Sequence, residues 1–438
     1  MNAPTSPFYG WKLLAALWAI MFINLAFPTY GLSVLDTYMA SDLHLSRMTL
    51  GLTYAAFMSM TGIPAPLAAW CIHRFGIRLT LVGGNLLLVI GAIAMATFVA
   101  SPTAIVLFAG VIVGTSDAIG GPVPAQASVT LWFVRHRSFA LAVLLSGAAV
   151  GGFIAAPLLD RIVAHSGLGW RAGWWLIAAL GVVACVISML FVRERPQDLG
   201  QAPDGGDTQA KADSRGALGR ARARVHVTSD DWSPWEALRS PTFWILMAAA
   251  LGFSAVLTLF LALGISQFED LRHSPESAAL ALSVSVLCGL GANLGVGFLG
   301  DRIDPRVLWA VCSALDAVGA FAVLDARSGA EMYVTAALLG IAGSGCMVCI
   351  VTLLGNYFGP RAYPAVFGTA SAIQSTLGAA APIVAGYWYD HHGSYRPIFI
   401  AGGLLCGAAS LALALISPPV LRPKPTGSGG TPTFDIVR

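Results

Sequence analysis

Twelve long apolar segments constrain this 438-residue chain more than any other feature of its sequence. Each is close to the roughly 20 residues that an α-helix needs to cross the hydrocarbon core of a bilayer. Only 11% of the residues are charged, against about 25% in an ordinary soluble domain. The predicted spans are 13–35, 49–70, 79–99, 103–127, 138–159, 173–192, 242–266, 277–299, 307–325, 332–356, 364–388 and 397–417. We therefore predict an all-α integral membrane protein with twelve transmembrane helices, and we exclude a water-soluble globule.

The basic residues predict how the chain is oriented. Most of the 25 Lys and Arg residues fall in the loops of one side when the N-terminus is placed in the cytoplasm. Basic loops stay on the cytoplasmic side, so both termini of this multi-pass protein are predicted to be cytoplasmic, in the cell membrane. The net charge of +3 is too small to indicate nucleic acid as a partner.

One break in composition divides the chain. The segment 193–241 is rich in Gly, Ala, Asp, Ser and Arg, and we interpret it as a solvated cytoplasmic linker with an amphipathic patch at 232–238. A role in regulation or in binding anionic lipid is the alternative. The predicted domains are a six-helix bundle over 1–192, the linker, a second six-helix bundle over 242–417 and a disordered tail over 418–438.

The two predicted bundles carry an internal repeat. Phe133 aligns with Phe358 after a shift of 225 residues, and Arg74 aligns with Arg302 after a shift of 228 residues. Two homologous halves in the same orientation predict a pseudo-twofold axis along the membrane normal, with the substrate site between the halves. Such a repeat indicates transport by alternating access.

The loop after the eighth span reads Gly297-Phe-Leu-Gly-Asp301-Arg302-Ile-Asp-Pro-Arg306, and here the chain resembles the major facilitator superfamily. The resemblance implies that carboxylate and arginine side chains hold the halves together on the cytoplasmic face until the transporter rocks. The first-half copy is degraded, because His73 replaces the family's Asp; it is either a weaker or pH-sensitive latch or an inert surface histidine. The predicted gating residues are Arg74, Arg78, Arg135, Arg137, Asp301, Arg302 and Arg306.

Three further stretches resemble the monocarboxylate and oxalate/formate branch of this superfamily. They are Phe8-Tyr9-Gly10-Trp11, the run from Trp132 to Arg137, and Gly169-Trp170-Arg171. The resemblance implies transport of a small organic acid, with proton symport favoured over anion exchange. There are two alternative hypotheses. The protein exports a neutral or amphipathic compound, or it is a sensor that transports nothing.

The basic residues that the resembled branch carries within its membrane spans are missing from this chain. Asn293 stands where characterised carriers have an arginine, Thr29 replaces a lysine of the first span, and the eleventh span has only Gln374. A carboxylate in a dry cavity costs several kcal/mol unless it is paired or hydrogen-bonded. The substrate-binding roles are therefore assigned to hydrogen-bonding residues, namely Asn24, Tyr54, Asn293 and Gln374.

Asp117 is the predicted proton-coupling residue. It lies near the middle of the fourth span on one helical stripe with Gly110, Gly114 and Gly121, so the stripe should face protein. An aspartate at mid-membrane costs about 2.5 to 3.5 kcal/mol on insertion scales, which makes function the first hypothesis. The alternative is a neutral Asp hydrogen-bonded to a neighbouring helix. Asp316 in the ninth span is assigned such a structural hydrogen bond.

No cofactor, metal site or enzymatic centre is predicted. Cys346-x-x-Cys349 lies inside an apolar span without a second ligand pair, so we interpret it as buried cysteines. No nucleophile-base pair or cofactor loop is visible in the sequence. The prediction as a whole is a monomeric secondary transporter with a small-molecule substrate, protons and the lipid bilayer as its partners.

Overall fold

The structure is a computed structural model that describes residues 7–99, 101–205, 225–228, 232–392 and 394–419, and every regular element in these residues is a helix. The first half contains α1 (Gly10–Met21), η1 (Phe22–Ala26), α2 (Phe27–Asp42), α3 (Arg47–Met60), α4 (Ala65–Phe75), α5 (Ile77–Phe98), α6 (Pro102–Ile105), η2 (Val106–Val113), α7 (Gly114–Gly120), α8 (Pro122–Trp132), α9 (Arg137–His165) and α10 (Trp170–Phe191). The short helices η3 (Pro196–Leu199), η4 (Pro203–Gly205) and α12 (Pro234–Arg239) follow. The second half contains α13 (Pro241–Asp270), α14 (Pro275–Gly300), α15 (Pro305–Ala322), α16 (Gly329–His392) and α17 (Arg396–Leu415).

The helices agree with twelve membrane crossings. Among the described residues, ten helices are long and apolar enough to span a membrane, or eleven when α3 and α4, bent by 41°, count as one. The 64-residue α16 breaks at Gly359, where φ is 70°. At 1.5 Å per residue an unbroken helix of that length would measure about 96 Å, far more than one bilayer core. Dividing α16 at Gly359 brings the number of crossings to twelve.

Local sequence explains where several of these helices begin. The side chain of Ser274 accepts a hydrogen bond from the Ser277 amide before α14, and Ser46 accepts one from the Thr49 amide before α3. Proline occupies the first residue of α8, α13, α14 and α15, where its missing N–H has no helical partner to lose. These signals fix the helix starts, whereas hydropathy marks only the apolar middle of each span.

The observed helices therefore extend beyond the predicted spans. The first crossing runs from Gly10 to Asp42 and includes the π-helical turn η1, whereas the prediction was 13–35. The tenth and eleventh crossings, predicted as 332–356 and 364–388, are continuous with each other except at Gly359. Polar helix ends satisfy their backbone hydrogen bonds within the helix and so add length that an apolar window does not detect.

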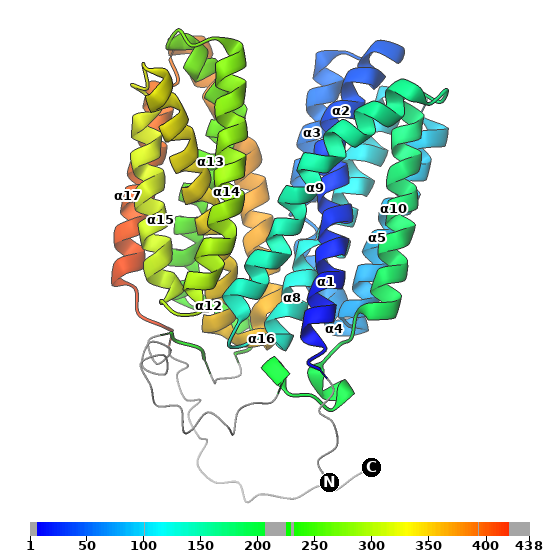
Figure 1. Ribbon diagram of the computed structural model, residues 1–438, viewed down its shortest axis with the longest axis vertical. Helices are drawn as coiled ribbons and strands as arrows, with labels where there is room; N and C mark the ends of the chain where they lie inside the picture. Colours follow the sequence, from blue (N-terminus) through cyan, green and yellow to red (C-terminus); the bar gives the residue numbers. More distant parts are fainter. Residues whose placement is uncertain (1–6, 100, 206–224, 229–231, 393, 420–438) are drawn as a thin grey trace, which may run out of the picture.

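The two halves form two groups of helices in space. Figure 1 shows α1 to α10 on one side and α13 to α17 on the other, side by side at one end of the molecule and apart at the other. The end at which α1 begins and α17 ends is called the terminal face here, and the other end the opposite face. The outward surfaces are apolar: Leu404, Leu411 and Leu415 of α17 are exposed by 63%, 68% and 83%. Such a surface suits lipid, and the chain is a multi-pass membrane protein.

Candidate functional site: the seam between the halves

A hydrogen bond between two fully buried side chains joins α8 of the first half to α16 of the second. The hydroxyl of Tyr363 donates to Oε1 of Gln126 at 2.8 Å, and both residues have no exposed surface. Nε2 of Gln126 is buried and makes no hydrogen bond with any described residue. The bond therefore belongs to a dry contact between the halves, the region called the seam below.

Arg137 at the start of α9 makes a second buried connection. Its Nη1 donates to Oδ1 of Asn356 on α16 at 2.8 Å, and the residue is only 2% exposed. Within the first half, Nε donates to the Phe133 carbonyl at 3.1 Å and Nη2 to the Thr130 carbonyl at 3.2 Å. Neutral acceptors thus surround a buried cation, and one of them is supplied by the other half.

Asp301 makes the third connection, from the end of α14. Its Oδ1 accepts a hydrogen bond from the Ser138 backbone amide at 2.9 Å. This amide lies in the first turn of α9, where the helix dipole favours a carboxylate. His136 adds a 3.8 Å approach from Nδ1 to Oδ2 of Asp301, which is an ion pair when the histidine is protonated. Thr352 Oγ1 also donates to Ser138 Oγ at 3.4 Å.

Glycines bring the two backbones together along the same seam. A Cβ atom on Gly297 would lie 2.3 Å from Cβ of Ala142 on α9. A Cβ on Gly62 would lie 1.9 Å from Oγ of Ser375 and 2.5 Å from the Ser371 carbonyl oxygen, both on α16. Real Cβ atoms do not approach so closely, so these positions require glycine while the terminal face is closed.

The predicted gating residues do not act as one cluster in this conformation. Of the seven, Arg137 and Asp301 contact the other half. Arg302 lies over the Phe298 ring at 3.6 Å, and Arg306 contacts Asp304 at 3.5 Å and donates to the Ile416 carbonyl, all within the second half.

The three other gating arginines contact the linker or the first half. The amides of Arg78 and Arg135 donate to Glu194 and Asp204 at 2.9 and 2.7 Å, and Arg74 lies over the ring of Phe75 at 6.0 Å. His73, the degraded latch position, is exposed.

Sequence analysis did not identify Gln126, Tyr363, Asn356, Ser138 or Thr352 as seam residues. A signal was present, because Gln126 and Asn356 are amide side chains at the ends of apolar spans, where polar groups need a partner. Which partner they meet depends on how the halves dock, and no local pattern encodes that.

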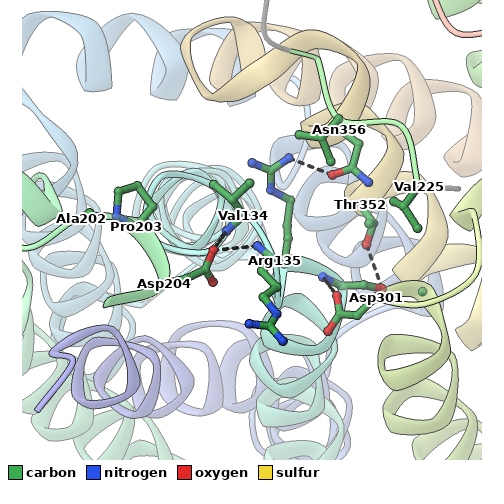
Figure 2. A pocket seen from close by; sticks show the side chains of 13 residues that line it. Val134, Arg135, Ala202, Pro203, Asp204, Val225, Asp301, Thr352 and Asn356 are labelled. Atoms are coloured by element: carbon green, nitrogen blue, oxygen red, sulfur yellow. Dashed lines mark hydrogen bonds between the residues drawn. The ribbon is translucent and has the colours of Figure 1, made fainter. Parts of the chain in front are cut away.

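A cavity of about 460 Å³ lies beside the seam at the terminal face. Figure 2 shows Arg135, Asp204, Asp301, Thr352 and Asn356 around it, with contributions from both halves and from the linker. None of the four predicted substrate-binding residues lines this cavity. Its charged lining is balanced, because two arginines and two aspartates contribute to it.

The described parts of the linker make hydrogen bonds to both halves, which the sequence did not indicate. Oδ2 of Asp204 accepts hydrogen bonds from the Val134 and Arg135 amides at 3.1 and 2.7 Å. On the other side, the Thr228 amide donates to the Asn356 carbonyl at 2.8 Å, and Trp232 is 4% exposed against Phe358. Residues 206–224 and 229–231 of the linker, and the predicted tail beyond residue 419, lie outside the described residues.

Asp117 lies in the interior of the first half together with Asn24. The two residues are 2% and 0% exposed, and Oδ1 of each accepts no hydrogen bond from any described residue. Nδ2 of Asn24 donates to Oδ1 of Asn85 on α5 at 2.9 Å. Gly110 and Gly114 pack against α3, so the stripe that carries Asp117 faces protein.

The other three predicted substrate-binding residues lie on different elements of both halves. Tyr54 on α3 is 46% exposed, and Gln374 is half-buried on α16 between the seam serines Ser371 and Ser375. Asn293 on α14 is 9% exposed, and its buried Oδ1 accepts no hydrogen bond from the described residues. Their binding roles stay predictions.

The buried groups of the second half form structural contacts. Asp316 is 1% exposed, and its Oδ2 lies 3.7 Å from the Cys406 thiol on α17. Cys346 and Cys349 are buried free thiols. No group of three His, Cys, Asp or Glu side chains in the described part of the chain is placed to hold a metal ion.

Asn356→Leu should weaken closure of the terminal face more than Tyr363→Phe does. Loss of the Asn356 amide leaves Nη1 of Arg137 buried without its acceptor, at a cost of about 1–3 kcal/mol or more because the donor is charged. Tyr363→Phe leaves Oε1 of Gln126 buried without its donor, and because this acceptor is neutral the cost is nearer the lower end of about 1–3 kcal/mol. Paired spin labels across the terminal face would measure both shifts, and equal effects would contradict a special role for Arg137.

Comparison with known proteins shows which family has this architecture. The family model described as Major Facilitator Superfamily matches residues 13–269 and 258–436. Monocarboxylate transporter 12 of Rattus norvegicus is 22% identical over 94% of this chain and 86% of its own length. The hexuronate transporter of Bacillus subtilis is 24% identical over 91% of this chain and 92% of its own length.

A solved structure gives the same result for the fold. The proton:xylose symporter XylE superposes with a TM-score of 0.69 at 17% identity, over 93% of this chain and 95% of that chain. The matched relatives are transporters and not enzymes, as the sequence predicted. With two groups of membrane-crossing helices and a family match that covers most of its length, the chain belongs to the major facilitator superfamily.

Proposed function

We propose that this protein is a secondary transporter of a small organic acid that works by alternating access and is driven by a proton gradient. The observation that carries this proposal is the one-sided seam. Its hydrogen bonds, among them those of Tyr363, Arg137 and Asp301, join the halves toward the terminal face. Neutral or singly charged contacts of this kind can be broken and remade during rocking, because each is worth only about 0.5–3 kcal/mol.

The substrate class follows from the relatives and from the polar residues of the spans. Both named relatives transport carboxylates by their names, a monocarboxylate and a hexuronate. The predicted spans contain no Lys or Arg, so a carboxylate would be held by hydrogen bonds or carried with a cation that neutralises it. Asn293, Tyr54 and Gln374 are the proposed substrate contacts, and Asp117 is the proposed coupling residue.

The topology is part of the same proposal. The terminal face would be cytoplasmic and the membrane the cell membrane, since the basic loops lie on that side. Closure of the terminal face then corresponds to a state open to the exterior, from which an importer would load its substrate. The fold neighbour XylE is a proton symporter, which supports the choice of coupling ion.

Uptake of labelled organic acids into vesicles that contain the purified protein tests this function. A panel of monocarboxylates and sugar acids should accumulate when the outside is acidified, and collapse of the pH gradient should stop accumulation. Equilibration without accumulation would contradict proton coupling. No movement of any acid would contradict the substrate class.

A second candidate is export of a neutral or amphipathic compound. It is favoured by the uncharged Asn293 at a position where carriers of the resembled branch have an arginine. The same vesicles distinguish the two functions, because an exporter would extrude a hydrophobic dye and leave the labelled acids outside.

A further inference from the structure

Three oxygen atoms converge beside Gly121 in the interior of the first half. The position that a Cβ atom on Gly121 would take lies 2.6 Å from the Asp117 carbonyl oxygen, 3.1 Å from Oδ1 of Asp117 and 3.2 Å from Oδ1 of Asn24. The oxygens come from two separate membrane crossings. Glycine is what leaves room between them.

The hydrogen-bond donors around these oxygens are directed elsewhere. Nδ2 of Asn24 donates to Asn85, and Nδ2 of Asn85 donates to the carbonyls of Leu81 and Gly120 at 2.7 and 3.4 Å. Ser116 donates to the Val113 carbonyl at 2.6 Å. Oδ1 of Asn24 and Oδ1 of Asp117 therefore stay buried acceptors that no described donor reaches. Buried acceptors without donors are costly, and a cation relieves that cost.

The backbone on both sides of the cluster is irregular. Helix α7 ends at Gly120, Gly121 has φ −117° and ψ −118°, and α8 begins at Pro122, so the fourth crossing is broken at this depth. Pro122 has no N–H to offer the Ala118 carbonyl. Asn24 lies in the π-helical turn η1 of the first crossing. Carbonyl groups at such breaks in transporter helices are suited to coordinate a small cation.

The charge of the cluster indicates a monovalent ion. Asp117 is its one carboxylate, and none of the ion pairs among the described residues involves Asp117. No three His, Cys, Asp or Glu side chains are gathered to hold a metal ion in the described part of the chain, so the cluster lacks the several anionic ligands with which divalent sites are usually built. One positive charge would neutralise the site without leaving a net charge in the low-dielectric interior.

We propose that the side-chain oxygens of Asn24 and Asp117 and the Asp117 carbonyl bind one Na⁺ ion at the break in the fourth crossing. The proposal rests on the proposed function only in that this ion would share Asp117 with the coupling proton. Binding itself can be measured without any substrate. Asn85 is a positioning residue. Its Oδ1 accepts the hydrogen bond from Nδ2 of Asn24, and this bond orients the Asn24 amide so that Oδ1 of Asn24 is available to the ion.

Thermal unfolding of the purified full-length protein in NaCl, compared with KCl and choline chloride at equal ionic strength and pH, tests the site. A bound ion raises apparent stability by mass action, so Na⁺ alone should raise the Tm. Binding of radioactive ²²Na⁺ should saturate at one ion per chain. Asp117→Asn should abolish both effects, and Gly121→Ala should do so by filling the space between the oxygens.

The matched control is Asp316→Asn, which changes another buried aspartate but should keep the Na⁺ response. An equal Na⁺ response in Asp117→Asn, or no Na⁺-specific response in the unmodified protein, would overturn the proposal. If Na⁺ has no effect while a pH gradient still drives uptake, the Na⁺ site is wrong and the proposed transport function stands. If Na⁺ binds but no acid is transported, the Na⁺ site stands and the proposed transport function is wrong.

Discussion

Gly62→Leu is expected to reduce transport by about tenfold to a hundredfold while leaving both halves folded. The new Cβ would lie 1.9 Å from Oγ of Ser375 and 2.5 Å from the Ser371 carbonyl oxygen, so α16 could no longer reach its present position. Overpacking of this kind costs about 1–3 kcal/mol, which is one to two powers of ten in the population of the closed state. The atoms nearest to the new Cβ all belong to α16 of the other half, so the clash lies between the halves.

Two measurements check this expectation. Substrate uptake should fall in vesicles, and spin labels across the terminal face should report a longer distance between the halves than in the unmodified protein. Gly407→Leu on α17 is the matched control, because no atom lies within 4 Å of the position of its Cβ. Normal uptake by Gly62→Leu would mean that closure of this seam is not a step of the transport cycle.

Asp117→Asn is expected to reduce gradient-driven accumulation to background and to spare exchange of substrate at equal concentrations. Asparagine has nearly the same shape but cannot carry the charge that a proton or Na⁺ must neutralise. The substitution also removes a mid-membrane carboxylate that costs about 2.5 to 3.5 kcal/mol to insert, so the variant should fold at least as well. Loss of accumulation could therefore not be attributed to unfolding.

Vesicle assays separate the two activities. Accumulation against a concentration difference is measured with an imposed pH or Na⁺ gradient, and exchange is measured with labelled substrate outside and unlabelled substrate inside. Asp316→Asn, in the second half, should leave both unchanged because its partner is the Cys406 thiol within one bundle. Undiminished accumulation in Asp117→Asn would assign Asp117 a structural role only.

The seam and the Asp117 cluster occupy different parts of the molecule. The seam joins the two halves at the closed terminal face, while the cluster lies within the first half. The linker also contacts both halves at the terminal face, the first half through Asp204 and the second half through Thr228. When the terminal face opens, either the linker contacts with one half break, or each stretch of the linker moves together with the half that it contacts.

The amino-acid sequence alone determined the class of this protein. Apolar segments of this length satisfy their backbone hydrogen bonds in a bilayer by forming helices. It also singled out Asp117 as a charged residue within a membrane span, and the resemblance to the major facilitator superfamily singled out Arg137 and Asp301. The transport roles of these residues stay predictions. Tertiary structure decided the partners. Arg137 contacts Asn356, which lies 219 positions away in the chain, and the Oδ1 atoms of Asn24 and Asp117 both lie near Gly121, at a helix break that no sequence periodicity indicates. Helix formation depends on neighbours in sequence, whereas these contacts depend on how rigid helices dock, and that is set by packing over the whole molecule.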